Sequence, residues 1–277
     1  MTQAPDMRME RDDDGAWIAI LGDFVLRTAF QPIFRFDQGH LAPIACEALL
    51  RVSRDGHPVL TEAFFAMLDA PSFIAIEPEL RRMHIRNASF IPSSQRRLFL
   101  NLDPRLAETP TRLHQALASL ADELRAARIP PADIVCEFTE VETACEATLP
   151  HFAHELRARG FVIAIDDYGD RASRPERVEA LAPDIVKFDG RLVKRLLATP
   201  AGIGTLRLMA SRFASDGIHC VLEGLETMRD IERAETTGAQ MLQGYALAEP
   251  RVAGPDFGAW IARFEPQPAQ RRAETVG

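Results

Sequence analysis

Side chains that can bind cations or move protons recur where short apolar runs of this chain end. Each of these runs is rich in β-branched and aromatic residues, and each carries a carboxylate, an amide or an amine near its C-terminal end. The residues are Glu47, Asn101, Glu137, Asp166, Asp167, Lys187, Glu223 and Gln243. The C-terminal ends of the strands of a parallel barrel meet on one face, so residues far apart in sequence would form one polar cluster there.

The composition of this cluster indicates a definite chemistry. Carboxylates brought together without cations repel one another and raise one another's pKa values. Carboxylate and amide oxygens are hard ligands that suit Mg²⁺ or Mn²⁺ and suit Zn²⁺ poorly. Two such ions, about 3.5–4 Å apart, activate a water and stabilise the charge on a phosphodiester during in-line attack. Lys187, the one cation among these residues, can orient that water or neutralise that charge. We therefore predict phosphodiester hydrolysis.

Each of these residues also has an ordinary structural interpretation. A glutamate at a strand end is commonly a cap or a dipole partner for the next helix. Asp166 and Asp167 can be a capping pair for the same reason, and Lys187 can pair with Asp184 or Asp189 on a solvated turn. Their joint occurrence on successive predicted strands favours the functional interpretation.

The order of apolar runs and helical segments predicts repeated βα units. The predicted strands are residues 30–34, 44–50, 98–101, 134–137, 162–166, 185–188, 218–223 and 241–244. Leu, Ala, Glu and Arg recur at helical spacing over residues 105–128, 143–159 and 191–216. The number of strands is that of a (β/α)₈ barrel, so we predict an α/β fold of this class.

Composition limits the classes of protein to which the chain can belong. Its 277 residues are 47% hydrophobic and 26% charged, as in a folded globular protein. The net charge of −8 argues against binding of DNA or RNA. No apolar stretch is long enough for membrane insertion, and the N-terminus has no secretory signal, so we expect a cytoplasmic protein. We expect one domain over residues 21–262, with tails at 1–20 and 263–277.

Cysteine and histidine form two weaker patterns. The four cysteines form no CxxC pair and are expected to be reduced and structural. His151, His154 and Glu155 are close together on a predicted helix, where a solvated face explains them better than a metal site.

Around Glu47-Ala48-Leu49 the sequence resembles the EAL-domain family of cyclic di-GMP phosphodiesterases. A single tripeptide is weak evidence, but further motifs follow in the family's order. They are Phe30-Gln31-Pro32-Ile33, Asn101-Leu102-Asp103-Pro104, Glu137-Phe138-Thr139-Glu140, Asp166-Asp167-Tyr168-Gly169, Ile185-Val186-Lys187-Phe188-Asp189, Glu223-Gly224-Leu225-Glu226-Thr227 and Gln243-Gly244-Tyr245. The resemblance covers roughly residues 21 to 262.

This resemblance implies a modified TIM-like (β/α)₈ barrel with one antiparallel strand, the first. It also implies hydrolysis of cyclic di-GMP to linear pGpG with two Mg²⁺ or Mn²⁺ ions, and inhibition by Ca²⁺. The implied metal ligands are Glu47, Asn101, Glu137, Asp166 and Asp167, with Asp167 as the bridge between the ions.

The resemblance implies roles for other residues too. Lys187 would hold the nucleophilic water, and Glu223 would complete the network of metal and water, so that these two residues and Glu47 form the catalytic set. The implied substrate contacts are Gln31, Arg51 and Gln243, of which Gln243 would also support the network. Glu140 resembles the family's loop anchor.

One segment departs from the family pattern and keeps an alternative open. After the paired aspartates, active relatives usually continue Phe-Gly-Thr-Gly-Tyr-Ser, whereas this chain has Tyr168-Gly169-Asp170-Arg171-Ala172-Ser173. In the family that loop couples the metal site to dimerisation. The alternative is therefore a weak or inactive module that acts as a cyclic di-GMP receptor or as a protein-interaction domain.

Three further expectations concern partners and chemistry. A homodimer is possible, and since we see no sensor or GGDEF domain in the chain, a regulatory signal is expected from a separate, unknown partner. A Schiff-base lyase that uses Lys187 is a further alternative, which the many carboxylates disfavour.

Overall fold

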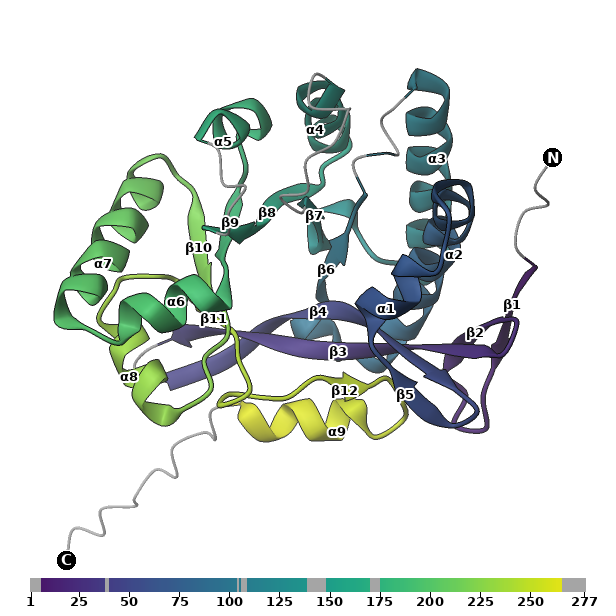
Figure 1. The fold of residues 1–277 in the computed structure, drawn as a ribbon, viewed down its shortest axis with the longest axis horizontal. Coiled ribbons are helices and arrows are strands. Elements are labelled where there is room, and N and C mark those ends of the chain that lie inside the picture. The colour runs from purple at the N-terminus through teal and green to yellow at the C-terminus, as the bar shows by residue number, and fades with distance from the viewer. Residues whose placement is uncertain are drawn as a thin grey trace, which may run out of the picture.

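A closed ring of strands forms the centre of the molecule (Figure 1). The computed structural model describes residues 6–37, 40–103, 105, 109–138, 148–169 and 175–265. The ring strands are β3 (Phe24–Asp37), β4 (His40–Arg54), β6 (Arg97–Asn101), β7 (Ile134–Phe138), β8 (Val162–Tyr168), β9 (Ile185–Phe188), β10 (His219–Leu222) and β11 (Met241–Leu242). They pair in the order β3-β11-β10-β9-β8-β7-β6-β4, and the β3–β4 pairing closes the ring.

Strand β3 runs against the rest of the ring. It pairs antiparallel with both β4 and β11, whereas the pairs from β4–β6 round to β10–β11 are parallel. Every predicted strand falls on one of the ring strands, although β10 and β11 end before Glu223 and Gln243. The predicted α/β barrel with a reversed first strand is therefore confirmed.

Helices cover the outside of this ring, as Figure 1 shows. They are α1 (Thr61–Ala66), α2 (Ala70–Asn87), α3 (Pro110–Ala127), α4 (Leu149–Ala158), α5 (Pro175–Leu181), α6 (Gly190–Leu197), α7 (Pro200–Ser215), α8 (Met228–Glu235) and α9 (Phe257–Ile261). The helical pattern over residues 191–216 divides into α6 and α7. Thr199 has an extended backbone and its side chain caps α7, while Pro200 at the first turn has no N–H to continue the preceding helix.

The N-terminal residues differ from the tail that we expected. Strands β1 (Met7–Arg11) and β2 (Trp17–Leu21) form an antiparallel hairpin that extends the sheet from β3. Met7 and Met9 alternate with charged residues, and this alternation places both methionines against a core cluster that includes Leu26 and Met83. The short strands β5 (His57–Val59) and β12 (Arg251–Val252) pair with β4 and β3.

An apolar layer fills the inside of the ring. Each ring strand contributes one buried residue to it, and these are Ile33, Ala45, Phe99, Val135, Ala164, Ile185, Val221 and Met241. Side chains two residues apart on a strand point to the same face. The residues two positions beyond this layer therefore also point into the barrel, at its C-terminal end.

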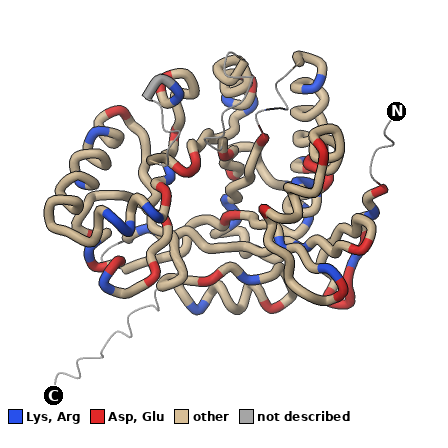
Figure 2. The backbone as a smooth tube through the Cα atoms, in the orientation of Figure 1, with Lys and Arg blue, Asp and Glu red and all other residues tan. Residues whose placement is uncertain are grey.

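The cysteines and the absence of a membrane-spanning segment are two expectations that can be compared with the described residues. Cys46, Cys136 and Cys220 are buried and free, as expected, while Cys145 lies outside the described residues. Within the described ranges, we find no helix with the length and apolar character that a bilayer crossing requires. Acidic and basic residues are interspersed over the outer elements (Figure 2).

Two glycines let the loops at the barrel mouth approach closely. Gly224 follows Glu223 and has φ +67°, and a Cβ added there would lie 2.7 Å from the Cα of Gly190, the first residue of α6. Gly224→Ala should therefore destabilise the protein by about 1–3 kcal/mol, since neither backbone can give way cheaply. Urea unfolding measures this free energy.

The matched control is Gly204→Ala in α7, where an added Cβ meets nothing within 4 Å. This substitution should stabilise the protein by about 0.5–1 kcal/mol, because alanine is the better helix former. Equal unfolding free energies for Gly224→Ala and the wild type would show that the glycine contact does not constrain the mouth.

Candidate active site

The predicted functional residues lie immediately beyond the apolar layer of the barrel. On the parallel strands each comes two residues after its layer residue, and on the reversed strand β3 it comes two residues before. These positions are Gln31, Glu47, Asn101, Glu137, Asp166, Lys187, Glu223 and Gln243. In the β3–β4 register Gln31 is the partner of Glu47. The strand period and the reversal of β3 thus gather residues from the whole sequence at one end of the ring.

Lys187 lies at the centre of this group and contacts four carboxylates. Its Nζ is 2.6 Å from Glu137 Oε1 and 2.8 Å from Glu223 Oε1. It is also 3.0 Å from Asp166 Oδ1 and 3.3 Å from Glu47 Oε2. The lysine is 1% exposed and Glu137 is fully buried. A buried ammonium among so many carboxylates neutralises only part of their charge, so the site retains a net negative charge.

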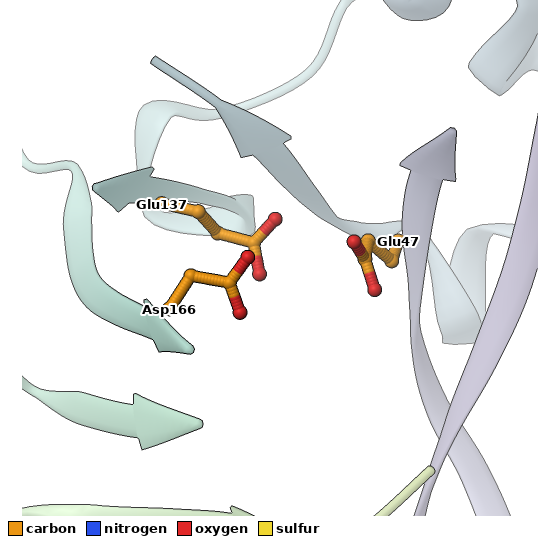
Figure 3. Close-up of side chains that lie close together, drawn as sticks. All are labelled: Glu47, Glu137 and Asp166. Atoms are coloured by element: carbon orange, nitrogen blue, oxygen red, sulfur yellow. The ribbon is translucent and has the colours of Figure 1, made fainter. Parts of the chain in front are cut away.

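The carboxylates come from different strands and face a shared space. Figure 3 shows Glu137 of β7 and Asp166 of β8 side by side, with Glu47 of β4 facing them. Oxygens of these three residues lie within 4.8 Å of one another, and the same holds for Asp166, Asp167 and Glu223. Asp166 belongs to both groups. This arrangement suits adjacent divalent cations that share a ligand.

The backbone of Asp167 explains how consecutive aspartates reach the same space. Asp167 has φ 56°, a left-handed conformation, and the β8–β9 register shifts between Ile165 and Tyr168. Consecutive strand residues normally point to opposite faces. The irregularity turns the Asp167 side chain back toward the cluster, where its oxygens join those of Asp166 and Glu223.

Two glutamines border the carboxylates. Gln243 Nε2 donates a hydrogen bond of 2.7 Å to Glu47 Oε2, and Gln31 Nε2 donates one of 3.2 Å to the Ala248 carbonyl. Both line a cavity of about 280 Å³ together with the acidic residues, Lys187 and Tyr245. The cavity opens at the barrel mouth directly above the charged cluster, so a ligand that enters it meets the carboxylates.

Burial and charge shift the pKa values in this site. Burial raises the pKa of Glu223 to about 8 and that of Glu137 well above its usual value, although Lys187 opposes both shifts. Desolvation and the neighbouring Asp166 raise the pKa of Asp167 to about 6. Burial alone would lower the pKa of Lys187, but the surrounding carboxylates raise it well above its usual value. The carboxylates therefore favour the charged, protonated form of Lys187 in the metal-free protein.

The donor set fits divalent metal ions. Glu137 is fully buried, yet its Oε2 has no hydrogen-bond partner among the described residues. Such an oxygen is costly to bury unless a cation or a proton completes it. All the clustered donors are carboxylate oxygens, which favour Mg²⁺ or Mn²⁺ over softer ions.

Not every predicted residue lies in this cluster. Asn101 holds the corresponding register position on β6, but it is exposed and lines a neighbouring cavity. Arg51 lines that same cavity, and its Nη1 donates to the Leu50 carbonyl. Glu140 and residues 170–174 of the divergent loop lie outside the described residues. The roles of Asn101, Arg51 and Glu140 stay predictions.

The ordinary interpretation of Lys187, a pairing with Asp184 or Asp189 on a solvated turn, does not match the geometry. Asp184 accepts a hydrogen bond from the Ile163 N–H, and Asp189 caps α6 by accepting from Leu192, so Lys187 pairs with the site carboxylates instead. Glu155 on α4 forms an ion pair with Arg159. The histidine pair near it, His151 and His154, is exposed, as expected for a solvated helix face.

A barrel with one reversed strand and a cluster of carboxylates at its mouth defines the class of fold to which this chain belongs. A family model described as "EAL domain" matches residues 21–250. The chain therefore belongs to the EAL-domain family.

Several curated relatives are named as established or probable cyclic di-GMP phosphodiesterases. A protein named cyclic di-GMP phosphodiesterase PdeB, from Shewanella oneidensis, is 26% identical over 229 residues, which are 81% of this chain and 26% of that protein. A probable cyclic di-GMP phosphodiesterase, PdeD of Escherichia coli, is 28% identical over 141 residues, which are 51% of this chain and 26% of that protein. The chain thus spans about a quarter of the length of these relatives.

Solved structures share the fold. BlrP1 of Klebsiella pneumoniae, in a complex with manganese and cyclic di-GMP, superposes with a TM-score of 0.72 at 25% identity, over 90% of this chain and 60% of that one. The EAL enzyme Bd1971, with cAMP and cyclic di-GMP bound, gives a TM-score of 0.73 at 21% identity, over 88% of this chain and 65% of that one.

The raised pKa of Glu223 makes the stability of the metal-free protein depend on pH. The folded state holds this proton up to a pKa of about 8, and the unfolded state only to about 4.5, so stability falls as pH rises through this interval. His84 acts in the opposite direction, because its pKa is lowered from 6.5 to about 4, but only below pH 6.5. From pH 7 to 8 in EDTA, the unfolding free energy should therefore fall, by at most about 1.4 kcal/mol per pH unit for one proton.

Urea unfolding at both pH values measures this slope. Glu223→Gln lacks this proton and should make the slope shallower. Mg²⁺ or Mn²⁺ in place of EDTA should also reduce the slope, because the cation competes with the proton. If the unfolding free energy instead rises from pH 7 to 8 in EDTA, the raised pKa of Glu223 is contradicted.

Proposed function

We propose that this protein hydrolyses cyclic di-GMP to linear pGpG with two divalent cations, Mg²⁺ or Mn²⁺, and so lowers the level of this second messenger. The observation that carries the proposal is the buried Lys187 surrounded by carboxylates at the mouth of an EAL-family barrel. The names of the relatives and the cyclic di-GMP in the titles of similar structures support the choice of substrate.

The carboxylates divide into two overlapping ligand groups. Glu47, Glu137 and Asp166 would hold one ion, and Asp166, Asp167 and Glu223 the other. The sequence resemblance instead names Asp167 as the bridge and adds Asn101, whereas the observed oxygens favour Asp166 as the shared ligand. When bound, the ions supply a nucleophilic water at neutral pH and neutralise charge on the phosphodiester.

Lys187 would act through the positive charge that its carboxylate neighbours favour. An ammonium that keeps its proton cannot act as a general base, but it can donate hydrogen bonds to the attacking water and to a phosphoryl oxygen. Its four carboxylate contacts fix its position in the absence of substrate. Lys187 is therefore an orienting and charge-stabilising group.

The glutamines and the glycine-lined rim would position the substrate. Gln31 and Gln243 line the cavity above the carboxylates, and Gly224 and Gly244 lie at its rim. Arg51 lies one cavity further along β4, where its guanidinium can contact a phosphate or a ribose of the dinucleotide.

A cyclic di-GMP receptor or protein-interaction domain with weak or no turnover is the alternative that the divergent loop keeps open. Asp170-Arg171-Ala172-Ser173 departs from the family loop, which in the family couples the metal site to dimerisation. Tight binding of cyclic di-GMP without product would support this alternative. A homodimer, a cytoplasmic location and a separate regulatory partner stay predictions, as do the domain boundaries at residues 21 and 262.

Removal of one carboxylate tests the activity. Glu47→Gln keeps the shape of the side chain and an oxygen that accepts from Gln243, but it removes the charge that would bind a cation. We expect metal-dependent pGpG formation to fall by about 10²-fold or more. Chromatography of cyclic di-GMP incubated with Mg²⁺ or Mn²⁺ measures the rate, and EDTA sets the baseline.

Glu235→Gln, an exposed position at the end of α8, is the matched control and should keep the wild-type rate. If Glu47→Gln keeps the wild-type rate, Glu47 is not a ligand of a catalytic metal ion. Intact substrate with the wild-type protein in every metal would move the protein to the receptor class.

A further inference from the structure

The N-terminal hairpin ends the sheet at an open edge. Strand β1 pairs with β2 on one side, and among the described residues no strand pairs with its other side. Figure 1 shows β1 at one outer end of the molecule. The strand also precedes residue 21, where the match to the EAL-domain model begins. This edge therefore lies outside the part of the chain that the family model describes.

The turn of the hairpin fixes the direction of the backbone groups of β1. The Asp12 N–H donates to the Ala16 carbonyl, and the Asp12 carbonyl accepts from the Gly15 N–H. Asp12 therefore directs both of its backbone groups toward β2. Along an antiparallel strand, successive residues direct these groups to opposite sides.

This alternation defines what the open edge offers. Arg8 and Glu10 direct their N–H and C=O groups toward β2, as Asp12 does. Met7, Met9 and Arg11 direct theirs away from β2, at the edge that no described strand covers. Such a row of donors and acceptors is a template for pairing with a further strand.

The two edges of this antiparallel sheet differ in how they are protected. Natural edge strands are usually short, or carry a proline, a lysine or a bulge that prevents further pairing. Strand β5 at the other edge has three residues and contains Pro58, which has no N–H to donate. Strand β1 has five residues without proline or lysine, and its register with β2 is regular. Only the edge at β1 thus lacks these protections.

The charges of β1 select a second copy of this chain as the partner. Arg8 and Glu10 lie on one face of the strand, with side chains 69% and 42% exposed. An antiparallel pairing of two copies centred on Met9 places Arg8 of each copy opposite Glu10 of the other. A pairing centred on Arg8 or on Glu10 would place like charges opposite each other, which is destabilising. Strand β1 is therefore complementary to itself in the register centred on Met9.

We propose that two copies of this chain associate through β1, in an antiparallel pairing centred on Met9 that joins their sheets into one. A twofold axis through the central pair makes the contact isologous, so assembly stops at the dimer. Met9 is partly buried against the core cluster beneath the hairpin, and contact with its counterpart would bury apolar surface of both copies. This surface is distinct from the divergent loop after Gly169.

Charge reversal tests the pairing. In Glu10→Arg, and equally in Arg8→Glu, both opposed pairs carry like charges, so each variant alone should associate about 10-fold or more weakly than the wild type. An equimolar mixture of the two variants places opposite charges across the contact and should restore the dimer. The double variant Arg8→Glu/Glu10→Arg should dimerise as the wild type does. Sedimentation velocity over a concentration series measures these masses.

The matched control for charge reversal is on the other side of the molecule. Arg212 of α7 is 77% exposed and pairs with Asp216, and Figure 1 shows α7 at the opposite end from β1. Arg212→Glu should leave the mass of the wild type unchanged.

A cysteine at the centre of the contact tests the register. Directly opposed residues of a hydrogen-bonded antiparallel pair have Cα atoms about 5.5 Å apart, which a disulfide can span. With diamide as the oxidant, Met9→Cys should therefore form a covalent dimer on a non-reducing gel. Met7→Cys is the control, because its counterpart would lie four residues along the partner strand, about 13 Å away. The wild type sets the baseline for the native cysteines.

Each outcome decides the proposal. A wild type that stays monomeric throughout the concentration series overturns it, and so does a dimer that both charge reversals leave intact. Equal cross-linking of Met9→Cys and Met7→Cys overturns the register, and a wild-type assembly larger than a dimer overturns the closed twofold contact. Restored association in the mixture of Glu10→Arg and Arg8→Glu supports the proposal. None of these measurements depends on hydrolysis of cyclic di-GMP.

Discussion

The ion pairs of Lys187 are the constraint on which the site depends. A lysine that is 1% exposed has lost its hydration, and only the surrounding carboxylates make its charge tolerable there. The dependence is mutual, because without the ammonium the carboxylates would repel one another in a partly buried space. The charges do not balance, however. Four carboxylates contact one ammonium, and this excess of carboxylates gives the mouth of the barrel a donor set that suits divalent cations.

The barrel provides the geometry that this charge cluster needs. An apolar layer closes the interior, and the position two residues beyond it carries a polar group, on six of the ring strands and just past the ends of β10 and β11. The reversed strand β3 follows the same rule in the opposite direction, since Gln31 precedes Ile33 and is the register partner of Glu47. The site is therefore a second layer of the barrel, and its residues are spaced by the strands rather than by flexible loops.

The sequence predicted the ring strands because their runs are apolar and end in polar residues. The hairpin of β1 and β2 was not predicted, because Met7-Arg8-Met9-Glu10-Arg11 is mostly charged and its methionines reveal their core contacts only when β3 is present. The direct contacts of Lys187 also depend on strand order, which spacing alone does not determine. The left-handed backbone of Asp167 is local, but no glycine or asparagine marks it.

The pair of Glu77 and Arg81 was missed for a different reason. An i,i+4 pair of opposite charge on a helix is usually a surface ion pair, so its spacing gives no sign of burial. Its position becomes informative only when α2 packs over β4 and β6 and encloses a cavity around it.

The two cavities meet at the shared Leu49. Carboxylates in excess of cations suit a divalent ion, whereas a carboxylate already paired with an arginine is too nearly neutralised to attract one. The number of cations that each carboxylate contacts therefore separates the chemistry of the acidic centre from that of the pair on α2.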